Sequence, residues 1–318
     1  MRATHEEPMQ PTSDLLIDRK RLKKHLASWR ALALVVIFAG AAVLASHLGP
    51  HHKAAGLSPD YIAQISIDDV MTDDKDRDEM MKDIRDDEHA KAVIVQFDSP
   101  GGTTVGGEEI YLQLKDIAAK KPVVGVMRTL CASACFMASL GTDHVVAREG
   151  TLTGSIGVLL QSFEVSRLAD KLGITPVSIK SGPMKDVPDI AEPMTKEQRD
   201  IVSEVVMDAY DHFVRLIVEK RKMSDEQVRK LADGRVYTGN QAYKLNLIDG
   251  IGGTDEALDW LEKTRKINPK LDIREMKPEP DSDSFWDQLS QQTGLKIFSK
   301  SAVGLDGLVS IWHPSLVQ

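Results

Sequence analysis

The residues most able to do chemistry lie in the stretch TLCASACFMASLG, Thr129–Gly141, where a serine stands between two cysteines. Ser133 follows an apolar run that is typical of a buried strand, and we expect it in the first turn of a helix. Such a turn leaves backbone amides without partners, here including that of Ala134, and favours developing negative charge. Ser133 is therefore well placed to act as a nucleophile, although a serine that only caps a helix would give the same pattern.

A serine hydroxyl needs a base that removes its proton. Of the nine histidines, only His144 lies near Ser133 in the sequence, and we expect it to begin a strand; a Gly-x-Ser-x-Gly turn is also lacking. A Ser–His–Asp triad is therefore poorly supported. Lys185 is the other option, because it follows a predicted strand and stands beside Met184 and Val187. Burial disfavours the charged form of a lysine, so a buried Lys185 could accept the serine proton; a solvated surface charge is the alternative.

Two glycines could supply the remaining part of a catalytic site. Gly101 and Gly102, in FDSPGG, directly follow a second predicted buried strand. Residues without a side chain let backbone N–H groups approach a ligand closely, and such groups can stabilise an oxyanion. A tight strand-to-helix turn would also use two glycines at this place.

Strand-like and helix-like segments alternate through the middle of the chain. Apolar runs predict strands at residues 61–67, 92–97, 122–127, 144–149, 175–182 and 271–274. Helical periodicity predicts helices at residues 73–91, 108–120, 166–172, 195–221, 223–232 and 257–266, and residues 234–253 predict a turn, a helix and a strand. This alternation predicts an α/β fold with a mostly parallel sheet and helices on both of its faces.

The N-terminal region is basic and is followed by an apolar run. Residues 1–31 carry seven Lys or Arg and four Asp or Glu, whereas the whole chain has a net charge of −8. The run Ala31–Leu48 is long enough to span a membrane, and the basic side stays in the cytoplasm, so we expect a single-pass anchor with the body outside. A cleaved signal peptide is the alternative. The acidic body argues against nucleic acid as a partner.

These observations divide the chain into five parts. They are a cytoplasmic basic tail (1–30), a transmembrane anchor (31–48), a linker (49–59), a body (60–276) and a C-terminal tail (277–318). The tail has helix-like apolar patches at Phe285–Leu289 and Leu305–Trp312. Because a soluble body should not leave such patches exposed, we expect them to pack on the body or on a neighbouring subunit.

Six motifs occur in a characteristic order: FDSPGG, CASACFMAS, GTLTGSIGV, ADKLGI, IKSGPMKD and GRVYTGNQAYKLNLIDGIGG. In this order they closely resemble the bacterial signal peptide peptidase A family, from about Ile65 to Leu261. The resemblance implies a ClpP/crotonase-like fold and a membrane-anchored serine–lysine peptidase that uses no metal or other cofactor. It implies released signal peptides and other unfolded peptides as substrates. It also implies a homo-oligomer, as a ring or dome, with its catalytic domain on the periplasmic side of the inner membrane.

The resemblance also assigns roles to individual residues. The nucleophile falls on Ser133, and the general base falls on Lys185, fifty-two positions later. The implied oxyanion donors are Gly101, Gly102 and Ala134, and the implied lysine-orienting residue is Ser155 of TGSIGV.

The chain departs from the family pattern beside the serine. The family has two glycines after the serine where this chain has Ala134 and Cys135. The added methyl and thiol should narrow the pocket and favour small residues at the cleaved position. If Cys131 and Cys135 lie on one helix, their side chains point the same way, which is poor geometry for a disulfide. We therefore expect two small, buried, free cysteines.

Two other functions remain compatible with the sequence. A crotonase-type acyl-CoA enzyme would share the fold and a glycine-built oxyanion hole, but it would not need Ser133 and Lys185. A catalytically inactive ClpP-like membrane scaffold would keep the fold alone, and the departure at Cys135 favours it. Acylation of Ser133 by a fluorophosphonate separates a peptidase from the first, and turnover that is lost in Ser133→Ala excludes the second.

Overall fold

The computed structural model describes residues 29–30, 35, 60–278 and 309–311 of the chain. The chain divides into two units, Met1–Ser58 and Pro59–Gln318. The predicted anchor, except for Val35, the predicted linker and most of the predicted N- and C-terminal tails lie outside the described residues. Within the described ranges, none of the helices combines the length and apolar character that crossing a membrane requires.

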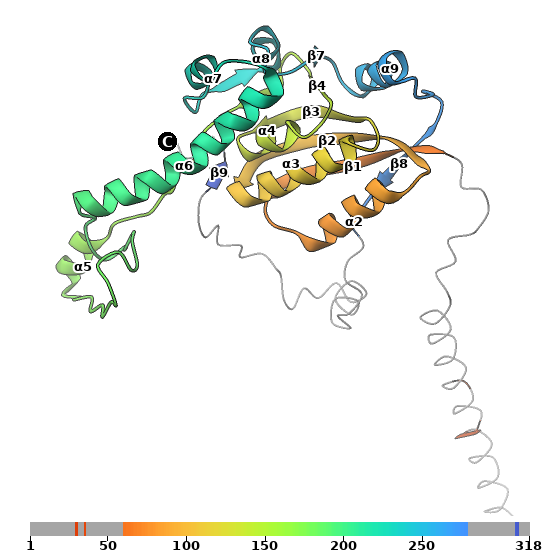
Figure 1. Ribbon diagram of the computed structural model, residues 1–318. Coiled ribbons are helices and arrows are strands. Elements are labelled where there is room, and N and C mark those ends of the chain that lie inside the picture. Colours follow the sequence, from red (N-terminus) through yellow and green to blue (C-terminus); the bar gives the residue numbers. More distant parts are fainter. Residues whose placement is uncertain (1–28, 31–34, 36–59, 279–308, 312–318) are drawn as a thin grey trace, which may run out of the picture. The chain divides into compact units, whose positions relative to one another are not determined.

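The second unit is built on one sheet, which the described residues form with nine strands (Figure 1). The strands are β1 (Tyr61–Met71), β2 (Ala90–Thr103), β3 (Val123–Ala132), β4 (His144–Ala147), β5 (Leu152–Gly154), β6 (Val236–Thr238), β7 (Gly250–Ile251), β8 (Asp272–Met276) and β9 (Val309–Ile311). The order is β6-β5-β3-β2-β1-β8, with β4 paired to β3 and β7, and β9 paired to β2. Within this sheet only β5–β6 and β2–β9 are antiparallel. The predicted mostly parallel α/β fold is confirmed.

Helices cover both faces of the sheet, which explains the near-continuous apolar runs of the central strands. They are α2 (Lys75–Asp86), α3 (Thr104–Ala118), α4 (Ala134–Ser139), α5 (Ser166–Leu172), α6 (Lys196–Arg221), α7 (Asp225–Leu231), α8 (Gly239–Lys244) and α9 (Thr254–Arg265). One core joins alternate strand residues such as Ile65, Val95 and Phe97 to α2, α3 and α4. The other joins Ile62 and Ile94 to α9. Each large apolar side chain buried in this way stabilises the fold by ~1.5–3 kcal/mol.

One segment has no part in either core. We call residues 158–209 the arm; it contains α5 and the first half of α6, which carries α5 away from the sheet (Figure 1). None of the arm residues is buried, and many of its exposed side chains are large and apolar. Examples are Phe163, Leu168, Leu172, Ile174, Val177, Ile179 and Ile190. An apolar surface of this extent on a soluble segment is typical of an interaction site.

Two predicted elements are wrong. Residues 175–182 alternate like a strand but form none, because they lie in the arm with no neighbouring strand; Ile179 is 98% exposed. The patch Leu305–Trp312, predicted as helix-like, contains β9, which is a strand paired with β2. The other patch, Phe285–Leu289, lies outside the described residues. Residues 175–182 do not form a strand because they have no strand to pair with, whereas residues 309–311 form one because they pair with β2. In both cases the available partner, and not local periodicity, decided the structure.

The hydroxyl of Tyr61, at the start of β1, donates a 2.8 Å hydrogen bond to Asp87 Oδ2. Burial, followed by this bond, raises the pKa of Tyr61 from 10.0 to about 12. Because the folded state holds the Tyr61 proton more tightly than the unfolded state, the protonated hydroxyl stabilises the fold. This contribution is fully present below pH 10 and is lost as the pH rises towards 12. Urea unfolding should find Tyr61→Phe less stable than wild type by ~1 kcal/mol at pH 7, with the difference vanishing at alkaline pH. The exposed Tyr243, replaced by Phe, should show neither effect; a pH-independent loss in Tyr61→Phe would contradict the assignment.

Candidate active site

Ser133 occupies a sharp turn between a strand and a helix. It directly follows β3 and caps the N-terminus of α4, with φ 61° and ψ −120°. A positive φ is unfavourable for a residue other than glycine, and such strain often accompanies a functional turn. Ser133 is 2% exposed, and every residue of α4 is buried. The turn therefore sets a hydroxyl at a helix N-terminus within a closely packed region.

Three strand ends meet at this turn. Ser99 of β2 pairs with Cys131 of β3, and Ala132 of β3 pairs with Gly154 of β5. The Ser133 N–H donates to Gly154 O at 2.7 Å. Ser155, the residue after Gly154, also has a positive φ, of 48°, and its N–H donates to Arg235 O at 2.8 Å. The structure thus brings together Ser133, Ser155 and the end of β2, which carries the predicted glycines.

Each predicted glycine is required by the local backbone. A Cβ on Gly102 would lie 1.9 Å from Met71 O, so β2 can approach β1 this closely only without a side chain. Gly101 has φ 105°, which favours glycine, and its N–H donates to Ser99 Oγ at 3.1 Å. Ser99 is fully buried, and its hydroxyl also bonds Asp69 O. Ser99 therefore holds the backbone at Gly101. The motif DSPGG contained it, but no local signal distinguished it from an ordinary turn serine.

The start of α4 is also fixed by close packing. A Cβ on Gly107 of α3 would lie 2.8 Å from the Cβ of Ala134, so the two helices touch at this glycine. Ala134 is fully buried. Its N–H is the first amide of α4, which is where a helix favours an anion. The predicted oxyanion donor Ala134 therefore lies on a short helix whose position is set by contact with α3.

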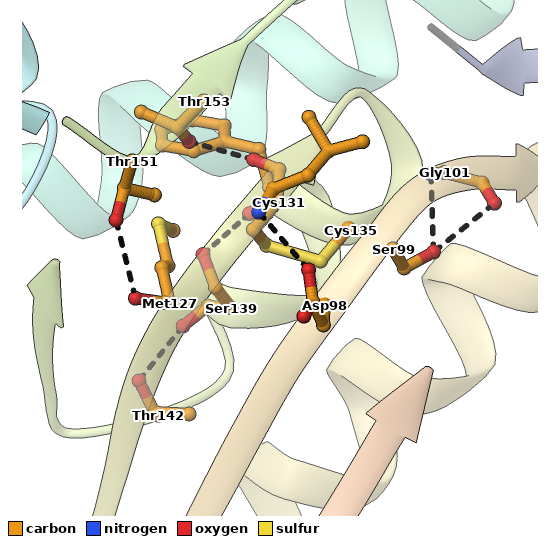
Figure 2. The surroundings of a disulfide bond; sticks show 12 residues. Asp98, Ser99, Gly101, Met127, Cys131, Cys135, Ser139, Thr142, Thr151 and Thr153 are labelled. Carbon is orange, nitrogen blue, oxygen red and sulfur yellow. Dashed lines mark hydrogen bonds between the residues drawn. A yellow bond between two sulfur atoms is a disulfide. The ribbon is translucent and has the colours of Figure 1, made fainter. Parts of the chain in front are cut away.

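The cysteines form a disulfide, Cys131–Cys135, and the prediction of two free thiols is wrong (Figure 2). The prediction assumed that both residues lie on one helix. Instead Cys131 is near the end of β3 and Cys135 is in α4, and the turn at Ser133 lies between them. This change of direction brings the two Cα atoms to 5.1 Å, which is within the usual range for a disulfide. The missed signal was the position of the pair across a predicted strand-to-helix turn.

Two carboxylates lie close to the same strand ends. Asp68 of β1 and Asp98 of β2 are paired in the sheet. Burial, and then the charge of Asp98, raises the pKa of Asp68. Asp98 Oδ1 accepts a 3.1 Å hydrogen bond from the N–H of Leu130, which joins β2 to β3 just before the disulfide. In a chain with 48 Asp and Glu, no sequence signal separates these two from surface acids.

Lys185 is the one predicted site residue that belongs to the arm rather than to the strand ends. It lies exposed in a turn of the arm, where its N–H donates to Gly182 O at 3.1 Å. The nearby Lys180 has different surroundings, because its Nζ lies 2.9 Å from Asp189 and 3.3 Å from Glu192. The bond to Asp189 raises the pKa of Lys180, so Lys180 is held in its charged form.

A strand from the C-terminal tail already pairs with the predicted oxyanion glycines. β9 runs antiparallel to the end of β2, with Gly101 opposite Ile311 and Gly102 opposite Ser310. The end of β2 therefore presents a sheet edge that accepts an extended peptide segment. Peptide recognition by addition of a strand uses the same backbone groups.

Comparison with known proteins supports a peptidase. Residues 115–268 match the family described as Peptidase family S49. A putative signal peptide peptidase SppA of Enterococcus faecium is 34% identical over 226 residues, which cover 70% of this chain and 66% of that protein. A putative protease of Synechocystis is 37% identical over 178 residues, covering 56% of this chain and 64% of that protein. The chain thus spans slightly less than two thirds of these relatives.

The chain also resembles solved structures weakly. A mutant of the membrane-bound stomatin-specific protease 1510-N has 15% sequence identity and a TM-score of 0.45, and the match covers 70% of this chain and 100% of that one. A likeness of this size carries no argument about activity. The fold is therefore taken from the strand order and register described above.

Proposed function

Because this chain belongs to peptidase family S49, to which its signal peptide peptidase A resemblance also points, we propose that it is a serine endopeptidase with Ser133 as nucleophile and Lys185 as base. The observation that carries the proposal is the turn at Ser133. A serine with φ 61° begins a buried helix where three strand ends meet. A serine that served only as a cap would accept a hydrogen bond from the helix amides, yet the Ser133 side chain makes no capping bond to α4.

The proposed chemistry needs few groups. Neutral Lys185 Nζ accepts the Ser133 proton, and Oγ attacks the carbonyl carbon of a peptide bond. Backbone amides stabilise the resulting oxyanion. The Gly101 N–H is already bonded to Ser99 Oγ, so we favour Gly102 and Ala134 as donors. The leaving amine takes the proton from the lysine, and water then hydrolyses the acyl-enzyme and regenerates Ser133. In this proposal Ser155 orients the lysine amine.

We propose that the lysine of each site comes from a second copy of the chain. Ser133 is buried in the body, whereas Lys185 is exposed on an arm that contains no buried residue. The arm's exposed apolar side chains require a partner surface, and a site completed by the partner's lysine gives that contact a function. The burial that would make Lys185 neutral would then arise on assembly. Each copy offers one arm and one turn, so a head-to-tail contact repeated from copy to copy would be able to close into a ring.

We propose unfolded peptides, including released signal peptides, as substrates. The support is the pairing of β9 with Gly101–Thr103, which has the extended, antiparallel form that a substrate strand would take. A folded protein cannot offer a free strand to this edge, whereas an extended peptide can.

We also propose that the predicted anchor holds the body on the outer side of the bacterial inner membrane. The disulfide supports this location, since disulfides persist in oxidising compartments and are rare in the cytosol. In spheroplasts, added protease should digest the body and leave a tagged N-terminus intact. Protection of the body in intact spheroplasts, with digestion after lysis, would overturn this location.

Labelling with a fluorophosphonate probe tests the nucleophile. The detergent-extracted, assembled chain should be acylated at Ser133, as shown by peptide mass spectrometry, and Ser133→Ala should not be labelled. Ser139→Ala is the matched control, because Ser139 is a buried serine in α4, the helix that Ser133 precedes, and its hydroxyl donates to Phe136 O at 2.7 Å. It should be labelled like wild type. Labelling that persists in Ser133→Ala, or that is absent from the assembled wild type, would overturn the proposal.

The pairing of β9 leads to a further prediction about substrate access. Deleting residues 309–318 should raise kcat/KM for a short peptide by at least about threefold, because a tethered strand competes with substrate at high effective concentration. Steady-state hydrolysis measures the effect. Deleting only residues 313–318 leaves β9 in place and serves as the control. Equal kcat/KM in both truncated chains and wild type would show that β9 does not compete.

A further inference from the structure

We infer that the Cys131–Cys135 disulfide is a positioning element of the catalytic turn, so that full peptidase activity requires the oxidised chain. The inference rests on the proposed function, because it concerns how Ser133 and the Ala134 amide are held. The bond joins the residues two before and two after Ser133, so the nucleophile lies at the centre of a covalent ring of five residues. Figure 2 shows the Cys131–Cys135 bond together with Ser99 of β2, which pairs with Cys131.

The turn needs support from outside itself. Ser133 adopts a positive φ, which is unfavourable for a serine. The helix that follows has only six residues, and helices of this length are unstable by themselves. The Ser133 side chain makes no capping hydrogen bond to α4. A covalent link from β3 to α4 removes alternative conformations that a chain without it could adopt.

One end of the link is firmly anchored. Cys131 lies in β3 between two neighbouring strands, opposite Ser99 of β2 and Thr153 of β5. Its carbonyl oxygen accepts a 2.7 Å hydrogen bond from Thr153 Oγ1 (Figure 2). The disulfide therefore ties the start of α4 to the centre of the sheet. The first amide of α4, that of Ala134, is one of the donors that the proposed reaction uses.

In the reduced form of the chain, Cys131 and Cys135 are two free thiols. Both cysteines are fully buried, so exchange with a reagent requires the turn to open transiently. Formation is an exchange with a disulfide donor: two cysteine thiols and one donor disulfide give the Cys131–Cys135 bond and two donor thiols. Reduction by a dithiol reverses it, and the dithiol leaves as a cyclic disulfide. In the reduced chain Ser133 and Lys185 remain, but the turn is less restrained.

The test compares the assembled wild type, oxidised and after reduction with dithiothreitol, with the double variant Cys131→Ala/Cys135→Ala. The rate constant for fluorophosphonate labelling of Ser133, kcat and KM are measured for each. Misplacing a nucleophile and an oxyanion donor affects the reaction more than binding. We therefore expect the reduced chain and the double variant to lose about tenfold or more in labelling rate and kcat, with KM within about twofold. Oxidised glutathione should restore the reduced wild type, and dithiothreitol should leave the double variant unchanged.

A matched variant separates positioning from a general loss of stability. Val228→Ala removes two methyl groups from a fully buried side chain of α7, a helix that does not include the turn, and should lower Tm while kcat stays near that of wild type. If Val228→Ala loses kcat in proportion to its lower Tm, the disulfide is only structural and the inference is overturned. Unchanged kcat in the folded double variant or in fully reduced wild type overturns it as well, as does mass spectrometry that finds two free thiols in the oxidised preparation. If the double variant does not fold, reduction and reoxidation of wild type decide. If oxidised wild type is not labelled at Ser133, the proposed function itself has failed.

Discussion

An equimolar mixture of Ser133→Ala and Lys185→Ala chains is expected to hydrolyse a peptide substrate, although each variant alone is inactive. Ser133 is buried in the body, whereas Lys185 is exposed on the arm. If each site takes its serine from one copy and its lysine from the next, random mixing makes about a quarter of the sites complete. Each pure variant lacks either the nucleophile or the base at every site, and should lose at least about 1,000-fold in kcat.

The measurement is hydrolysis of a fluorogenic peptide after the two chains are unfolded together and reassembled. Mixing wild type with the Ser133→Ala/Lys185→Ala double variant is the control for assembly, and it should give the same fraction of complete sites. An inactive mixture, in samples where differently tagged chains purify together, would show that both residues act within one copy. The proposal of a shared site would then be withdrawn, while the roles of Ser133 and Lys185 could stand.

Placing charge on the apolar surface of α5 should have a comparable effect on activity. Leu168 and Leu172 are both exposed in the single chain, and α5 buries none of its residues. Replacing both by Asp should therefore leave the fold of each copy unchanged but prevent the arm from packing on another copy. Without the partner's lysine, kcat should fall by at least about 100-fold. Analytical ultracentrifugation and peptide hydrolysis measure the two effects together.

Lys171→Asp is the matched control for this second prediction. Lys171 lies on the same helix and is exposed, so the substitution also adds negative charge without removing an apolar side chain. It should keep the assembly and most of the activity. An active, fully assembled Leu168→Asp/Leu172→Asp chain would contradict the role given to the arm. Loss of helical circular dichroism in that variant would indicate unfolding, and the proposal would then depend on the mixture of Ser133→Ala and Lys185→Ala chains.

The sequence predicted most of the body, because burial on both faces of a parallel sheet leaves a clear pattern. Ile94 and Val95 point to opposite faces of β2, and each finds a core of its own. The errors occurred where tertiary neighbours decide the conformation. Residues 175–182 have the alternation of a strand but no strand to pair with, whereas Val309–Ile311 pair with β2 despite a helix-like pattern.

The sequence suggested residue types for the candidate site but not their geometry. The strand ends do bring Ser133 beside Ser155, as parallel pairing of β3 and β5 requires. The disulfide was missed because spacing along a helix was assumed for Cys131, which belongs to a strand. The position of Lys185 could not be predicted, since the sequence of one chain does not distinguish a loop that folds back from an arm that extends to a neighbour.

Because the arm contains no buried residue, the proposed site depends on assembly, and this determines when hydrolysis can begin. A newly made copy carries a serine without its lysine, and is therefore a latent enzyme under the proposed arrangement. Under that arrangement, dilution should keep the copies inactive and assembly should activate them, so turnover should rise more steeply than linearly with expression level. A cell that holds few copies would then be spared indiscriminate digestion of its own exported chains.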